Sequence, residues 1–142
     1  MEKRASEAFE AIKNYLAKPP VLMPPREDRP LKLYLAAAEE SMGVLLAQDN
    51  NFGKEQAIYY LSRFLNSVEC KYSVVEKFCL TLYFAAMKLR YYLLPRTVLV
   101  ISNTDLIKYM LSRPILRGKI GKWSLALIEF CLEYVSQKTI KG

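Results

Sequence analysis

The chain has 142 residues, 52% of them hydrophobic, a formal net charge of +7 and no histidine. This length and hydrophobic content suit one domain with a buried core and exclude a disordered tail. The lack of histidine excludes histidine-based catalytic triads and histidine zinc sites. The three cysteines are too few for a disulfide framework. No apolar run reaches the roughly 18 residues of a membrane span, and no signal-peptide core follows Met1, so we expect an intracellular, cytoplasmic protein.

The first thirty residues are predicted to form a connection segment. Apolar residues recur at helical spacing between Ser6 and Ala17, which predicts a short amphipathic helix. The prolines that follow predict no regular element from Lys18 to Pro30. We therefore divide the chain into a connection segment, residues 1–30, and a folded domain, residues 31–142.

Three strands are predicted at the start of the folded domain. Leucines alternate with other residues over Leu31–Ala37, and mostly apolar runs follow over Gly43–Gln48 and Gln56–Leu61. Asp49–Gly53 is a cluster of turn-forming residues. Such short connections favour an antiparallel meander.

The longest helical signal covers Tyr72–Leu93. Ser73 and Glu76 have the spacing of a capping box, and Pro95 ends the pattern. An apolar stripe recurs at steps of three and four, and a second set of apolar residues widens it. The stripe is Leu80, Tyr83, Phe84, Met87 and Tyr91, and the second set is Cys79, Leu82, Ala86, Leu89 and Leu93. We expect a largely buried central helix with the stripe in the core.

The C-terminal part alternates further strands and helices. β-branched residues predict a buried strand at Thr97–Ser102. Periodicity then predicts a short helix, a basic loop, a second helix with Trp123, Leu127 and Phe130 inward, and an edge strand. Their ranges are Asp105–Ser112, Arg113–Gly121, Lys122–Cys131 and Glu133–Lys138. The fold class is α/β.

The positive charge is concentrated in one quarter of the chain. Lys88 to Lys122 contains eight basic residues and one acid, whereas the remainder has 13 of each. Such an excess favours a polyanionic partner such as nucleic acid, and a solvated face of a soluble domain explains it equally well. The candidate nucleic-acid-binding residues are Lys88, Arg90, Arg113, Arg117, Lys119 and Lys122.

This order of elements, with its motifs, resembles the ribonuclease H domain of Ty3/gypsy-type retrotransposon polyproteins, plant elements most closely. The resemblance covers nearly the whole chain, and its motifs lie at Phe9–Lys13, Pro20–Leu22, Leu33–Gln48, Ile58–Arg63, Tyr72–Lys77, Lys88–Leu93, Leu111–Pro114 and Gly118–Trp123. It implies an RNase H-like fold: a five-stranded mixed sheet with helices packed on it, three antiparallel strands, and a fourth strand parallel to the first. It also implies an adjoining reverse transcriptase domain, an RNA–DNA hybrid as partner and, in the cell, retroelement particles.

The resemblance also locates the former catalytic site. Enzymes of this family hold two Mg²⁺ ions with carboxylates, and the matching positions here are Ala36, Phe78 and Asn103. A fourth aspartate is expected beyond Gly142. Because alanine and phenylalanine cannot bind a metal and asparagine is neutral, we expect no intact catalytic residue, no metal and no cofactor. The nearby acids are Glu39, Glu40, Glu76 and Asp105.

Three functions follow as hypotheses. The first is a non-catalytic module that holds an RNA–DNA hybrid weakly and without sequence preference. The second is a residual metal-dependent ribonuclease H that uses the displaced acids. The third is a protein-interaction module that keeps only the fold. All three expect Ala36, Phe78 and Asn103 to lie in one small area.

Overall fold

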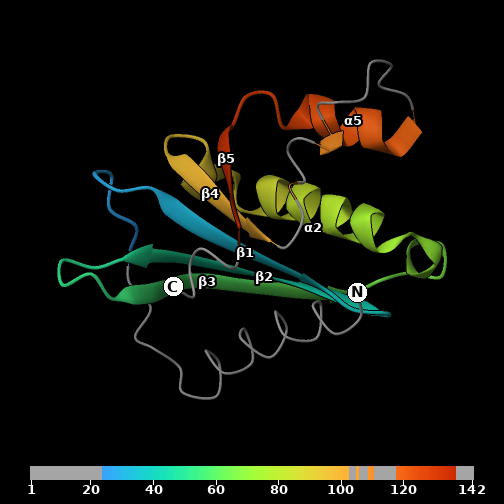
Figure 1. Ribbon diagram of the computed structural model, residues 1–142, viewed down its shortest axis with the longest axis horizontal. Helices are drawn as coiled ribbons and strands as arrows, with labels where there is room; N and C mark the ends of the chain where they lie inside the picture. The colour runs from blue at the N-terminus through green and yellow to red at the C-terminus, as the bar shows by residue number, and fades with distance from the viewer. Residues whose placement is uncertain (1–23, 103–104, 106–108, 111–117, 137–142) are drawn as a thin grey trace.

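The structure is a computed structural model that describes residues 24–102, 105, 109–110 and 118–136, with the backbone alone for 118–120. A five-stranded sheet has α2 packed across one face, and α5 lies beside α2 on the same side (Figure 1). The strands are β1 (Leu31–Ala37), β2 (Ser41–Asp49), β3 (Glu55–Phe64), β4 (Thr97–Ser102) and β5 (Cys131–Ser136). The helices are η1 (Glu69–Lys71), α2 (Val74–Lys88), α3 (Arg90–Leu93) and α5 (Gly118–Ala126).

The strand order is β3-β2-β1-β4-β5. The pairs β1–β2 and β2–β3 are antiparallel, whereas β4 is parallel to both β1 and β5. This arrangement confirms the predicted mixed sheet and the predicted pairing of the first and fourth strands. A right-handed crossover through α2 is the usual way to join such parallel strands.

The hairpin strands are longer than predicted. β2 begins at Ser41, and β3 continues to Phe64, its partner in the ladder. The apolar pattern stops at Leu61, because the residues that follow on this outer strand are polar or exposed. Backbone pairing with β2 extends the strand beyond its hydrophobic part. The apolar pattern in a sequence indicates which residues are buried, and it does not indicate how far backbone pairing between two strands continues.

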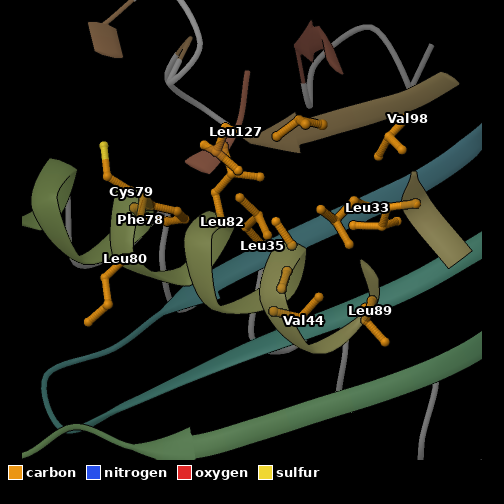
Figure 2. Close-up of a cluster of buried hydrophobic side chains, with 14 of the residues drawn as sticks. Leu33, Leu35, Val44, Phe78, Cys79, Leu80, Leu82, Leu89, Val98 and Leu127 are labelled. Atoms are coloured by element: carbon orange, nitrogen blue, oxygen red, sulfur yellow. The ribbon is translucent and has the colours of Figure 1, made fainter. Parts of the chain in front are cut away.

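The main core lies between the sheet and the helices. Leu33 and Leu35 on β1 and Val44 on β2 point toward α2, and Leu82 and Leu89 of the helix meet them (Figure 2). Leu127 closes the cluster from the α5 side. Alternate residues of β1 point to the other face of the sheet.

The start of α2 forms as predicted. The Glu76 amide donates to Ser73 Oγ at 3.2 Å, and the Ser73 amide donates to Glu76 Oε1 at 2.9 Å, which completes a capping box. The helix is interrupted at Leu89, whose φ is −108°, and α3 continues to Leu93. The single long helix predicted from the sequence is therefore two helices.

The prediction that the stripe of α2 lies in the core holds for Leu80, Tyr83 and Phe84 and was wrong for its C-terminal end. Within the predicted stripe, Met87 is 37% and Tyr91 94% exposed. The residues predicted to widen the stripe all belong to the main core, namely Cys79, Leu82, Ala86, Leu89 and Leu93. Both sets are apolar, so periodicity did not choose between them.

Replacing Ser73 by alanine is expected to lower the free energy of unfolding by about 1 kcal/mol, because one helix N-cap is lost. Urea unfolding followed by circular dichroism measures this change. Ser67→Ala is the control, since Ser67 is exposed in the turn before η1. An equal loss in both variants would mean that the capping box does not stabilise α2.

The α5 region differs from the prediction in its boundaries. The segment 118–121, predicted as part of a basic loop, is the first turn of α5, and the helix ends at Ala126. Tight turns follow, in which Leu127 N–H donates to Ser124 O and Phe130 N–H to Leu127 O, both at 3.1 Å. The buried positions of Trp123, Leu127 and Phe130 are as predicted. β5 starts at Cys131, two residues before the prediction.

Other sequence predictions lie outside the described residues. These are the N-terminal helix at Ser6–Ala17 and most of the helix at Asp105–Ser112. At the latter, the Tyr109 amide donates to Asp105 O at 3.0 Å, a helical spacing. Within residues 24–30 no helix or strand is present, as predicted.

Candidate functional site

Ala36 lies on the face of the sheet opposite α2. It pairs with Gly43 of β2 near the end of β1, and no part of it is exposed. Its neighbours on that face are Leu45 and Ala57, and Tyr34 and Tyr60 pack against them. Among the described residues, its methyl group is therefore packed in an apolar cluster.

Phe78 lies in the main core, near the start of α2, and is 8% exposed. Figure 2 shows its ring on the sheet side of the helix. Leu35 and Ala37 belong to the same cluster as Phe78, so the alternation of β1 places Ala36 on the opposite face. The prediction that Ala36 and Phe78 lie in one small area was therefore wrong, and side chains on opposite faces of a sheet cannot share one pair of metal ions. Asn103 lies outside the described residues.

Both positions are nevertheless at the same end of the sheet. Lys77 Nζ donates to the Glu39 carbonyl at 3.1 Å, which ties the first turns of α2 to the β1–β2 turn. Glu39 and Glu40 are exposed in that turn, and the Leu65 amide donates to Glu40 O at 2.8 Å. These backbone contacts hold the turn in place and leave both carboxylates facing solvent.

The described residues do not fit a pair of Mg²⁺ ions. Glu76 is used by the capping box. In the part of the chain that the structure describes, no three aspartate, glutamate or cysteine side chains gather closely enough to hold a metal. Two dications need several carboxylate oxygens, so nothing described here performs that role.

Arg90 is not a free cation. Its guanidinium pairs in bidentate fashion with the Glu129 carboxylate, with one Nη2–Oε2 distance of 3.0 Å, and lies over the Phe130 ring. The hydrogen bond to Glu129 raises the pKa of Arg90. Glu129 lies outside the basic window, 39 residues away, so a count of charges along the sequence could not reveal the pair.

The structure describes the side chains of only some of the other basic residues that were predicted to bind nucleic acid. Lys88 and Lys122 are exposed, at the end of α2 and on α5. The backbone of Lys119 belongs to α5, and Arg113 and Arg117 lie outside the described residues. Of the six predicted nucleic-acid-binding residues, Lys88 and Lys122 are thus the two whose described side chains are exposed and available to a polyanion.

A charged network on the face of Ala36 was missed by the sequence analysis. Lys32 Nζ lies 2.9 Å from Asp49 Oδ1 and 3.3 Å from Glu55 Oε2, and Tyr34 Oη donates to Glu55 at 2.6 Å. Burial opposes the charge of Lys32, but the hydrogen bond to Asp49 and the charge of Glu55 raise its pKa. The only sequence signal was alternation, which places Lys32, Tyr34 and Ala36 on one face. The network stabilises the β1–β2–β3 hairpins.

No helix within the described ranges is long and apolar enough to cross a lipid bilayer.

Comparison with known proteins gives consistent matches. The model of a family described as "RNase H-like domain found in reverse transcriptase" matches residues 1–100. The Pol polyprotein from transposon 297 of Drosophila melanogaster is 29% identical over 134 residues, which is 93% of this chain and 12% of that protein. The chain thus spans about an eighth of this relative.

Solved structures of similar fold include foamy viral protease–reverse transcriptases. One, in complex with dsDNA, has a TM-score of 0.66 at 21% identity and covers 92% of this chain and 28% of that chain. Another, in complex with an RNA/DNA hybrid, has a TM-score of 0.62 at 24% identity and covers 83% of this chain and 16% of that chain. Both confirm the fold.

Proposed function

The chain belongs to the family of RNase H-like domains found in reverse transcriptase, and we propose that it acts as a catalytically degenerate module of a retrotransposon polyprotein. In this role it helps to hold an RNA–DNA hybrid, weakly and without sequence preference. It cuts neither strand, because Ala36, Phe78 and Asn103 stand where the resemblance places acids that bind catalytic Mg²⁺.

The observation that carries this proposal is that Ala36 and Phe78 are both packed against apolar side chains. Both are buried among apolar side chains, on opposite faces of the sheet. A methyl group and a benzene ring have no lone pair to offer a hard cation.

Finer assignments rest on the sequence motifs. The proposal places the chain among Ty3/gypsy-type elements, nearest to those of plants. It takes residues 1–30 as a connection to an adjoining reverse transcriptase domain and residues 31–142 as the RNase H-like domain. The polyprotein would act inside the cell, in the cytoplasm and in retroelement particles.

Hybrid binding is supported by the basic excess and by a solved neighbour, a foamy viral protease–reverse transcriptase in complex with an RNA/DNA hybrid. Contacts of this kind reach phosphates, so they carry no sequence information and weaken as salt rises. The pairing of Arg90 with Glu129 reduces the number of free cations. Weak binding is therefore expected.

Salt-dependent binding of a labelled hybrid tests this function. Replacing Lys88 and Lys122 together by alanine should reduce the slope of log affinity against log salt by about 2, since each removed lysine costs about one phosphate contact. The matched control is the pair Lys54→Ala and Lys71→Ala, two exposed lysines elsewhere on the surface. Affinity that is independent of salt, or an equal loss in both pairs, would favour the protein-interaction module instead.

A residual nuclease is the second candidate function. Its support is the contact between Lys77 and Glu39, which holds the two free carboxylates of the β1–β2 turn beside the start of α2. A nuclease of this kind would depend on Glu39 and Glu40.

A further inference from the structure

The central helix is apolar on two faces. One face packs on the sheet, and the other carries the stripe that the sequence predicted to be core. We call this second face the outer stripe, and its members are Leu80, Tyr83, Phe84, Met87 and Tyr91. Leu80 is buried, Tyr83 and Phe84 are half-buried, and Met87 and Tyr91 are exposed. Exposure of apolar surface thus increases toward the end of the helix and into α3.

The outer stripe is continuous with aromatic groups on both sides. Toward β3, the Arg63 guanidinium lies 5.4 Å from the Phe84 ring, and the Tyr59 and Tyr92 rings are 6.2 Å apart. Toward α5, the Tyr83 ring stacks on Trp123 at 6.0 Å. Tyr59 itself is 42% exposed. The stripe is therefore the centre of a broad surface that spans α2, α3 and β3.

The charges beside the outer stripe are mostly neutralised. Arg63 forms a bidentate pair with Glu69, with two N–O distances of 2.8 Å, and Arg90 pairs with Glu129. Lys88 is the exposed cation on this part of α2. A stacking platform for nucleic acid needs free cations along its length, whereas exposed tyrosine and methionine with paired arginines are typical of a protein interface.

The relatives indicate which protein meets this surface. The matched region is 12% of the transposon 297 polyprotein and 28% of a foamy viral protease–reverse transcriptase chain. In those proteins most of the polypeptide falls outside the matched region. Those other parts are covalently joined to the matched module, so their effective concentration at its surface is high. An exposed apolar face on such a module is suited to the domain next to it.

We propose that the outer stripe docks on an apolar surface of the reverse transcriptase domain that adjoins this module in the same polyprotein. The inference rests on the proposed function, because it requires a reverse transcriptase neighbour. Tyr91 and Met87 insert at the centre of the contact. Docking of this kind fixes the module relative to the polymerase.

Site-specific photocross-linking in the polyprotein that contains this chain tests the proposal. Tyr91 is replaced by photoreactive benzoylphenylalanine, and the cross-linked peptides are identified by mass spectrometry. The matched control carries the same group at Phe52, which is 87% exposed in the β2–β3 turn and outside the stripe. Cross-links from position 91 to reverse transcriptase peptides are expected at least tenfold above those from position 52.

Three other outcomes would overturn the proposal. They are cross-links from position 91 to a second copy of the module, cross-links to nucleic acid, and equal yields at the two positions. Hybrid binding by the 142-residue chain separates this result from the proposed function. Tyr91→Ser should leave hybrid binding unchanged. If position 91 gives no cross-links to reverse transcriptase while the chain still binds the hybrid, the docking proposal fails and the proposed function stands.

Discussion

Replacing Phe78 by glutamate is expected to destabilise the domain by about 3–5 kcal/mol, because a carboxylate would replace a ring inside the main core. Phe78 packs in one cluster with Cys79, Leu82 and Leu35 of the sheet. Burial would raise the pKa of the introduced carboxyl group, so the folded state would bind a proton more readily than the unfolded chain. The deficit in stability should therefore shrink as the pH falls from 7 to 5.

Urea unfolding at both pH values measures this effect. Phe78→Leu is the control, since it keeps the site apolar and should cost less than about 1.5 kcal/mol. A Phe78→Glu variant as stable as Phe78→Leu at pH 7 would show that this position is a polar pocket. The site would then still be able to accept a metal-binding acid.

Much of the fold could be predicted from local pattern. The alternation of leucines located β1, the β-branched run located β4, and Ser73 with Glu76 located the start of α2. These features depend on neighbouring residues and on the two periodicities of strand and helix. The parallel pairing of β1 and β4 followed from the helix that joins them.

The orientation of α2 could not be predicted in the same way. A helix that is apolar on two faces has no single preferred side, and the sheet selects between them. Cys79, Ala85 and Ala86 lie in the main core, whereas Met87 and Tyr91 of the predicted stripe are exposed. The interruption at Leu89 has no glycine or proline at that residue to mark it.

The candidate site shows a similar division. The absence of a carboxylate at Ala36 and Phe78 is read directly from the sequence, whereas their positions on opposite faces of the sheet could not be predicted from it. The pairing of Arg90 with Glu129 could not be predicted, because the two residues lie 39 positions apart in the sequence and meet only in the folded chain. The network of Lys32, Asp49 and Glu55 was missed for the same reason.

The chain is expected to bind an RNA–DNA hybrid without cutting its RNA strand, with Mg²⁺ or with Mn²⁺. Two divalent ions are strongly hydrated, and only anionic ligands compensate for the loss of their water. Neither Ala36 nor Phe78 supplies such a ligand. An active ribonuclease H under the same conditions is the positive control. The double variant Glu39→Gln/Glu40→Gln, which removes the two exposed carboxylates of the β1–β2 turn, is the matched test of residual activity.

The most direct measurement follows an end-labelled hybrid with the chain in excess, by gel shift and by denaturing gel from the same reactions. The expected result is a shifted, salt-sensitive complex whose RNA strand stays intact with either metal. RNA cleavage that persists through purification and disappears in Glu39→Gln/Glu40→Gln would contradict the degenerate module and establish a residual nuclease.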